Sequence, residues 1–135
     1  MALRTRSAPV DVTDVPALAD SEFAPAHDLV DELAAVAASE DYVAAVFDRL
    51  GRLVWSDGSA LMRRVARAAD FVPGTDWSER AAGTNAPGLS LASGAPATVV
   101  AVEHWSDAVL NWVWYAAPIR NRTGRVIGAV DLSST

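Results

Sequence analysis

Residues 109–119 constrain the fold more than any other part of the chain. Trp112 and Trp114 occupy alternate positions on one face of this segment, whereas Val113 and Tyr115 occupy the other face. Successive side chains of a strand point to opposite faces of a sheet. An apolar pattern on both faces therefore predicts a central strand that is covered on both sides. Such a sheet needs helices from other parts of the chain to cover it.

Two four-residue turns show how neighbouring strands are joined. Residues 48–51 and residues 121–124 each begin with Asp or Asn and end with Gly, which is typical of a type I turn. Each turn predicts a hairpin, because apolar segments flank it on both sides. Hydrophobic periodicity and capping residues predict the remaining elements: helices over 26–39, 59–69 and 84–94, and strands over 42–47, 52–55, 97–102 and 125–133.

These elements predict an α/β (α+β) fold, in which helices cover both faces of a mainly antiparallel sheet of about five to six strands. Residues 1–25 contain three prolines and no clear periodicity, so we expect a flexible N-terminal lead-in. Residues 26–135 are expected to form one domain, because the 135-residue chain is long enough for one hydrophobic core.

Composition excludes several classes of function. The chain has 17 acidic and 11 basic residues, so its negative charge disfavours direct binding to nucleic acid and to anionic membranes. It has no cysteine, which removes thiolate metal sites, cysteine nucleophiles and thioether-linked cofactors. No stretch approaches the roughly 20 apolar residues of a spanning helix. We therefore expect a cytoplasmic protein.

Four short blocks occur in an order that resembles a known family. They are Trp77-Ser78-Glu79, Gly83-Thr84-Asn85-Ala86, Glu103-His104-Trp105 and Ala116-Ala117-Pro118-Ile119. Together they resemble the GAF domain of bacterial transcriptional activators of the acetoin-catabolism-regulator type. The resemblance covers residues 27–134 and implies a GAF-like or PAS-like sheet with helices on both faces. It also implies sensing rather than catalysis, because in this family a small ligand or a partner biases an attached effector.

Tryptophans supply most of the candidate ligand-binding residues. We predict a cavity between the sheet and residues 71–94, with Trp77 and Trp105 as walls and Trp112 and Trp114 as the floor. Thr84 and Asn85 lie at the start of a predicted helix, where backbone amides and a side-chain amide could contact a polar group of the ligand. The alternatives stay open at this point: each Trp could pack in the core, and Asn85 or Thr84 could serve only as a helix cap.

Catalysis and metal binding are not predicted. Glu103 and His104 are adjacent in a strand, so their side chains point to opposite faces and should not share a pocket. We therefore assign no catalytic residue, no metal and no cofactor. Two functions remain: a sensing domain that binds a small organic metabolite non-covalently, and a protein-interaction module without a ligand. Either one is compatible with a homodimer that pairs through an apolar stripe on helix 26–39, which is formed by Leu29, Leu33, Val36 and Ala37.

Overall fold

The computed structural model describes Phe23, residues 27–105 and residues 108–135, with the side chains of Phe23, 28–100 and 111–135. In chain order the elements are α1 (His27–Ser39), β1 (Val43–Asp48), β2 (Leu53–Gly58), α2 (Ala60–Ala68), α3 (Glu79–Ala82), α4 (Ala86–Ser93), β3 (Ala97–Trp105), β4 (Ala108–Arg120) and β5 (Val126–Ser134).

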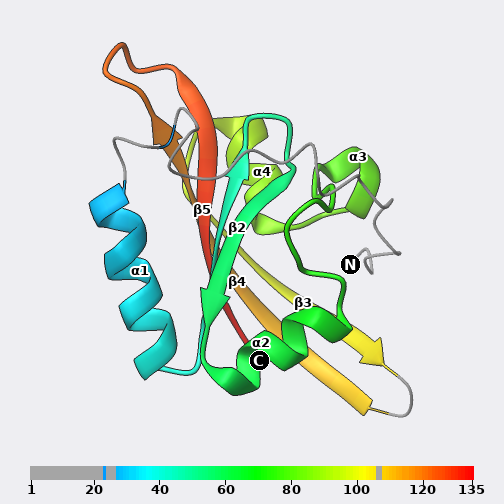
Figure 1. Ribbon diagram of the computed structural model, residues 1–135. Helices are drawn as coiled ribbons and strands as arrows, with labels where there is room; N and C mark the ends of the chain where they lie inside the picture. Colours follow the sequence, from blue (N-terminus) through cyan, green and yellow to red (C-terminus); the bar gives the residue numbers. More distant parts are fainter. Residues whose placement is uncertain (1–22, 24–26, 106–107) are drawn as a thin grey trace.

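The five strands form one sheet in the order β2-β1-β5-β4-β3, and every neighbouring pair is antiparallel. Helix α1 lies on one side of this sheet, and the segment that contains α2, α3 and α4 lies on the other (Figure 1). The predicted fold class is therefore confirmed. Each face has its own hydrophobic cluster, a smaller one beneath α1 and a larger one beneath α2–α4.

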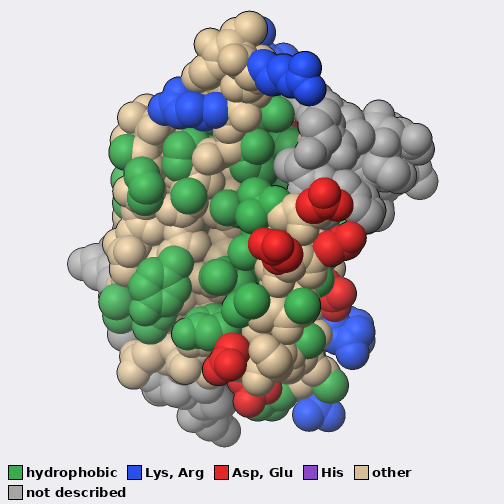
Figure 2. Space-filling model, turned by 90° about the vertical axis from the view of Figure 1, so that its left-hand side faces the viewer, with side chains coloured by type: hydrophobic (Ala, Val, Ile, Leu, Met, Phe, Trp, Pro, Cys, Tyr) green, Lys and Arg blue, Asp and Glu red, His purple; other side chains and the backbone are tan. Residues whose placement is uncertain are grey.

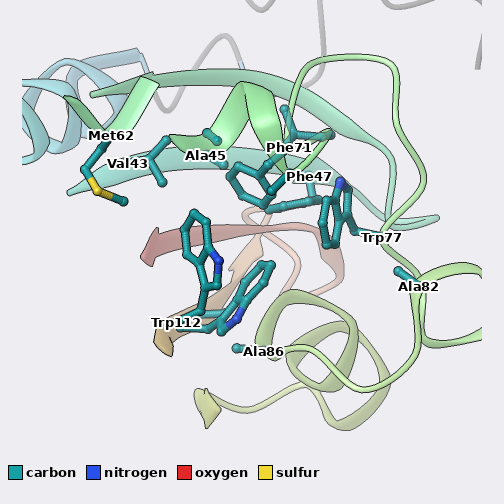
Figure 3. Close-up of a cluster of buried hydrophobic side chains, with 14 residues drawn as sticks. Val43, Ala45, Phe47, Met62, Phe71, Trp77, Ala82, Ala86 and Trp112 are labelled. Carbon is teal, nitrogen blue, oxygen red and sulfur yellow. The ribbon is translucent and has the colours of Figure 1, made fainter. Parts of the chain in front are cut away.

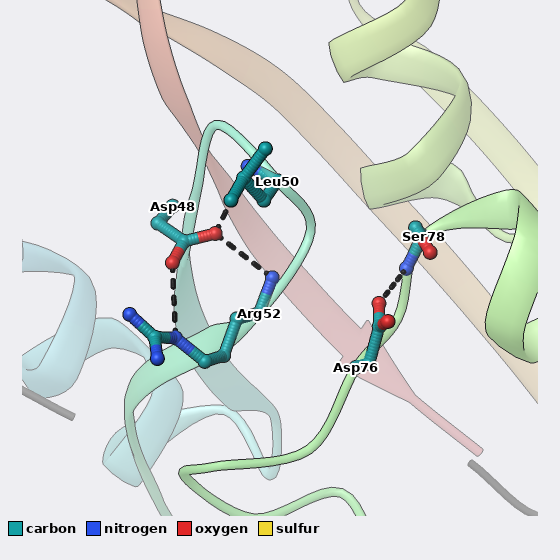
Figure 4. Close-up of polar contacts among 5 residues, drawn as sticks. All are labelled: Asp48, Leu50, Arg52, Asp76 and Ser78. Carbon is teal, nitrogen blue, oxygen red and sulfur yellow. Dashed lines mark hydrogen bonds and ion pairs between the residues drawn. The ribbon is translucent and has the colours of Figure 1, made fainter. Parts of the chain in front are cut away.

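The predicted turn at residues 48–51 also positions a distant segment. Asp48 Oδ1 accepts hydrogen bonds from the amides of Leu50 and Arg52, and its Oδ2 accepts one from Arg52 Nε at 3.1 Å (Figure 4). Gly51 has a φ of +90°, and a Cβ there would lie 2.7 Å from the amide nitrogen of Ser78. Only glycine allows the β1–β2 turn to approach the start of α3 this closely.

Helix boundaries follow the capping residues. Ser59 accepts a hydrogen bond from the Met62 amide at the start of α2, and Gly94 ends α4 in the left-handed conformation with φ +69°. The short helix α3 was not predicted, because its four residues are too few for a periodic pattern. Ser78 caps it, and Glu79 lies in its first turn, where an acidic residue is favourable.

The predicted coverage of residues 109–119 is wrong in one respect. Strand β4 is paired on both edges, but β5 is the middle strand of the sheet. The face of β4 that carries Trp112 and Trp114 is buried, whereas Tyr115 on the opposite face of β4 is 47% exposed. The cause is the placement of α1. This helix packs on β1 and β2, near one edge of the sheet, and leaves the part of the same face that β3 and β4 form open.

The prediction of a flexible lead-in over residues 1–25 falls almost entirely outside the described residues and stays a prediction. Phe23 is the exception. It is 2% exposed and belongs to the cluster beneath α1, together with Val30 and Ile127. A Cβ at Gly128 would lie 2.6 Å from the Phe23 ring, so the absence of a side chain on β5 makes room for this aromatic residue.

Candidate ligand-binding site

An aromatic cluster occupies the sheet face beneath α2–α4, and it contains three of the predicted site residues (Figure 3). The ring centroids of Trp77 and Trp114 are 5.5 Å apart, and those of Trp112 and Trp114 are 5.9 Å apart. Phe71 contacts this group edge-on, with its centroid 5.1 Å from that of Trp77. Residues far apart in sequence thus form one continuous aromatic surface over β4 and the 71–77 loop.

Trp77 is held by polar contacts at both its ring and its backbone. Its Nε1 donates a hydrogen bond to Thr75 Oγ1 at 2.7 Å, and its amide donates to the carbonyl of Gly51 at 2.8 Å. The side chain is 1% exposed. The β1–β2 turn therefore fixes the position of this tryptophan against the sheet.

Asn85 caps α4, which is one of the two roles predicted for it, the other being a ligand contact. Its Oδ1 accepts a hydrogen bond from the Gly88 amide at 2.8 Å, and its Nδ2 donates to the carbonyls of Trp77 and Gly83. The side chain is 2% exposed and already uses both of its polar atoms within the protein. Thr84 is exposed, and the side chain of Trp105 lies outside the described part of the chain.

We expect Asn85→Ala to lower the free energy of unfolding by roughly 2 to 3 kcal/mol. Loss of a cap accounts for about 1 kcal/mol, and loss of the hydrogen bonds to the buried Trp77 carbonyl and the half-buried Gly83 carbonyl adds the rest. Asn121→Ala is the matched control, because Asn121 accepts amide hydrogen bonds in an exposed turn. Urea unfolding of both variants checks this, and equal losses would show that Asn85 does not tie α4 to the Trp77 segment.

Asp131 is a second buried feature of this face, and the sequence reasoning did not select it as a site residue. In the sheet register it lies directly opposite Ala45 on β1 and Ala116 on β4. Residues on the same face of β5 are Ala129 and Ser133, two positions away in each direction. Ala116 shares its face of β4 with Trp112 and Trp114, so Asp131, which is 1% exposed, lies on the same face as the tryptophans.

Burial raises the pKa of Asp131 to about 8, and its hydrogen bond with Ser133 opposes the shift only in part. The carboxyl group is therefore mostly protonated at neutral pH. Ser133 Oγ bonds to Oδ2, while Oδ1 and the indole nitrogen of Trp114 have no hydrogen-bond partner among the described residues. In the sequence, the feature that could have identified this residue is an Asp at an inward-facing position of a mainly apolar strand.

Hollows lined by described residues occur on the α2–α4 side of the sheet. One of about 170 Å³ borders Val43, Ala66 and Phe71, which all belong to the cluster. Another, of about 240 Å³, is a surface groove between Leu50 and α4. Both are smaller than a typical ligand pocket of about 300 to 1,000 Å³, and neither is lined by Trp77, Trp112 or Trp114. A cavity floored by Trp112 and Trp114 stays a prediction.

Within the part of the chain that the structure describes, no three His, Cys, Asp or Glu residues are grouped as a metal site would require. The side chains of Glu103 and His104 lie outside that part. No helix among the described residues is long and apolar enough to cross a membrane.

Sequence comparison connects this fold to bacterial regulators. Over 93 residues the chain is 34% identical to the acetoin dehydrogenase operon transcriptional activator AcoR of Bacillus subtilis. This match covers 69% of the chain. The chain is a relative of one region of the acetoin-type transcriptional activators. The resemblance predicted from the four sequence blocks is thereby confirmed.

Two further relatives extend the comparison. The acetoin catabolism regulatory protein of Cupriavidus necator is 32% identical over 69% of the chain, and an uncharacterized 47.3 kDa protein of Rhodococcus erythropolis is 38% identical over 72%. The matched regions span 22%, 15% and 14% of the Rhodococcus, Bacillus and Cupriavidus proteins. No protein-family model matches the chain. The relatives with assigned roles are transcriptional regulators rather than enzymes, as the sequence predicted.

Solved structures support the fold. The complex of Escherichia coli DhaR(N) with DhaL contains a chain that matches with a TM-score of 0.76 at 19% identity, covering 98% of this chain and 45% of that one. An RNA-binding light-oxygen-voltage receptor matches with a TM-score of 0.56 at 21% identity, covering 95% of this chain and 37% of that one. At these identities the likeness establishes a PAS/GAF-like fold and no more.

Proposed function

We propose that residues 26–135 form the sensing domain of a cytoplasmic bacterial transcriptional regulator and bind a small organic metabolite without a covalent bond. The observation that carries this proposal is the sheet face beneath α2–α4. It combines a surface of Trp77, Trp112 and Trp114 with a buried carboxyl group that is only partly hydrogen-bonded. Apolar walls with a few polar groups are the usual composition of a small-molecule site. The regulatory role of the named relatives also supports the proposal of a sensing domain.

The contacts around Trp77 suggest how binding could be transmitted. The segment that carries Trp77 is bonded to the β1–β2 turn through Gly51 and to α4 through Asn85. A ligand that displaces the Trp77 ring would therefore move α4 relative to the sheet. We propose this coupling as the first step of the response, because a ligand shifts a conformational equilibrium only through contacts that differ between the two states.

Thermal unfolding with a panel of small metabolites tests the proposal. We expect 3-hydroxybutan-2-one (acetoin), the compound whose catabolism the named relatives regulate, or a related small ketone or diol to raise the Tm. At a hundredfold excess over the Kd, binding adds about 2.7 kcal/mol to the free energy of unfolding, a shift of several degrees. If no short ketone, diol, alcohol or aromatic acid shifts the Tm at millimolar concentration, the sensing proposal is wrong.

An interaction module is the second candidate, and the open half of the sheet supports it. Figure 2 shows hydrophobic side chains gathered on the sheet beside α1. On β3 and β4, Val100 is 57% exposed and Tyr115 is 47% exposed. The predicted stripe of α1 is divided, because Ala37 is buried while Leu29 and Val36 are each 45% exposed. An exposed apolar surface of this kind is typical of a protein interface, and we propose that a second copy of the chain covers it.

Sedimentation tests the homodimer. We expect the protein to sediment as a dimer at high micromolar concentration and Tyr115→Glu to sediment as a monomer, because a buried carboxylate in an apolar interface is strongly unfavourable. Leu61→Glu is the control, since Leu61 is 51% exposed on α2, on the other side of the sheet. A monomeric parent protein, or a dimer that persists with Tyr115→Glu, would exclude this interface.

A further inference from the structure

We infer that Asp131, together with Ser133 and Trp114, is the polar anchor for an uncharged ligand that carries a hydroxyl or carbonyl group. This inference rests on the proposed sensing function and names the chemical class that the site selects. It starts from the position of Asp131 in the middle strand, with its side chain on the face beneath α2–α4.

Small side chains surround Asp131 on that face. Its cross-strand neighbours are Ala45 and Ala116, and its neighbours along β5 are Ala129 and Ser133. The bulky aromatic residues of the cluster stand outside this ring of small residues, on β1, on β4 and on the 71–77 loop. None of these four adjacent side chains is larger than serine.

The unsatisfied polar atoms define what the site can bind. Oδ1 of Asp131 and Nε1 of Trp114 are buried and have no hydrogen-bond partner among the described residues. Trp114 lies directly opposite Ser133 in the β4–β5 register, and Ser133 is bonded to Asp131. An indole N–H only donates, whereas a protonated carboxyl group both donates and accepts. A ligand hydroxyl can therefore bond to either atom, and a ligand carbonyl oxygen can accept from the indole N–H or from the carboxyl O–H.

The charge around the site disfavours an anionic ligand. Asp131 is the one ionisable side chain that is fully buried among the described residues, so no buried cation is present there to pair with an anion. Arg63 and Arg67, which line the 170 Å³ hollow, are exposed on α2. Burying an anionic ligand beside this neutral carboxyl group, without a cation to pair with it, would be strongly unfavourable.

A purely structural role explains these observations less well. One serine hydroxyl satisfies one oxygen of Asp131, and the other oxygen is buried without a partner in the described part of the chain. A leucine of similar shape would remove that desolvation penalty and pack against the same apolar cluster. Polar groups that reduce stability in this way are expected at functional sites.

Calorimetric titration of two matched variants tests the anchor, with 3-hydroxybutan-2-one and butane-2,3-diol as uncharged probes and lactate as an anionic probe of similar size. We expect the parent protein to bind an uncharged probe and not lactate. Asp131→Leu should weaken that binding about tenfold, as loss of one hydrogen bond predicts, while its Tm stays equal or rises. Asp131→Asn, which keeps donors and an acceptor, should bind within about threefold of the parent.

The other outcomes separate this inference from the function on which it rests. Equal binding by the parent and Asp131→Leu, or a preference for lactate, would overturn the anchor and leave the sensing function intact. A lower Tm for Asp131→Leu would show that the carboxyl group is structural and would also overturn the anchor. If the parent binds no small molecule of any class, both proposals fail.

Discussion

Asp131→Asn is expected to remove a decline in stability that the parent protein shows between about pH 4 and pH 8. Below pH 4 the carboxyl group is protonated in both the folded and the unfolded state. As the pH rises, the unfolded chain releases this proton first, because burial raises the pKa of the folded state from 3.8 to about 8. The free energy of unfolding therefore falls until the pH passes the folded pKa. Each unit of pKa difference corresponds to about 1.4 kcal/mol, so the difference of about four units predicts a decline of roughly 6 kcal/mol.

Urea unfolding of the parent and the variant at several pH values measures this effect as a difference, so titration of other groups cancels. Glu32→Gln is the matched control, because it removes a carboxyl group at an exposed position of α1. Parallel profiles for the parent and Asp131→Asn would mean that Asp131 titrates normally and is not buried in the folded protein.

Trp77→Ala is expected to lower the free energy of unfolding by about 3 to 5 kcal/mol, the range for removing a large aromatic side chain from a core. The ring is 1% exposed and contacts both Phe71 and Trp114. Its loss also leaves Thr75 Oγ1 without the hydrogen bond that it accepts. We therefore expect this variant to be among the least stable single substitutions in the domain.

Trp55→Ala provides the comparison for Trp77→Ala. Trp55 is half-buried on β2 and packs at the edge of the cluster beneath α1, so its removal should destabilise the protein by a smaller amount. Chemical unfolding monitored by circular dichroism measures both variants without relying on tryptophan emission. A loss below about 2 kcal/mol for Trp77→Ala would indicate that the ring borders open space rather than a packed core.

Local patterns predicted much of this fold because the residues involved act through neighbours in sequence. Asp48 and Asn121 each accept amide hydrogen bonds within four residues, so both turns were visible as Asx-x-x-Gly. Asn85 and Gly94 likewise mark the ends of α4 by local hydrogen bonds. The shared face of Trp112 and Trp114 follows from strand periodicity alone.

Other features depend on tertiary placement and could not be read from the chain. Tyr115 is exposed because α1 covers the opposite end of the sheet, and no local pattern encodes where a helix docks. The environment of Asp131 depends on the registers of two strand pairs, which bring Ala45 and Ala116 beside it. Asn85 was recognised as a cap, but its bonds to Trp77 and Gly83 required the path of the 71–83 segment.

Ligand binding on the face beneath α2–α4 is tested most directly by the NMR signals of the tryptophan indole N–H groups. Titration with 3-hydroxybutan-2-one or butane-2,3-diol should shift the signals of Trp114 and Trp77, which lie in the aromatic cluster. The signal of Trp55 should stay in place, because that residue packs on the opposite face of the sheet. A shift confined to Trp55, or binding that moves neither Trp114 nor Trp77, would contradict a ligand site on this face.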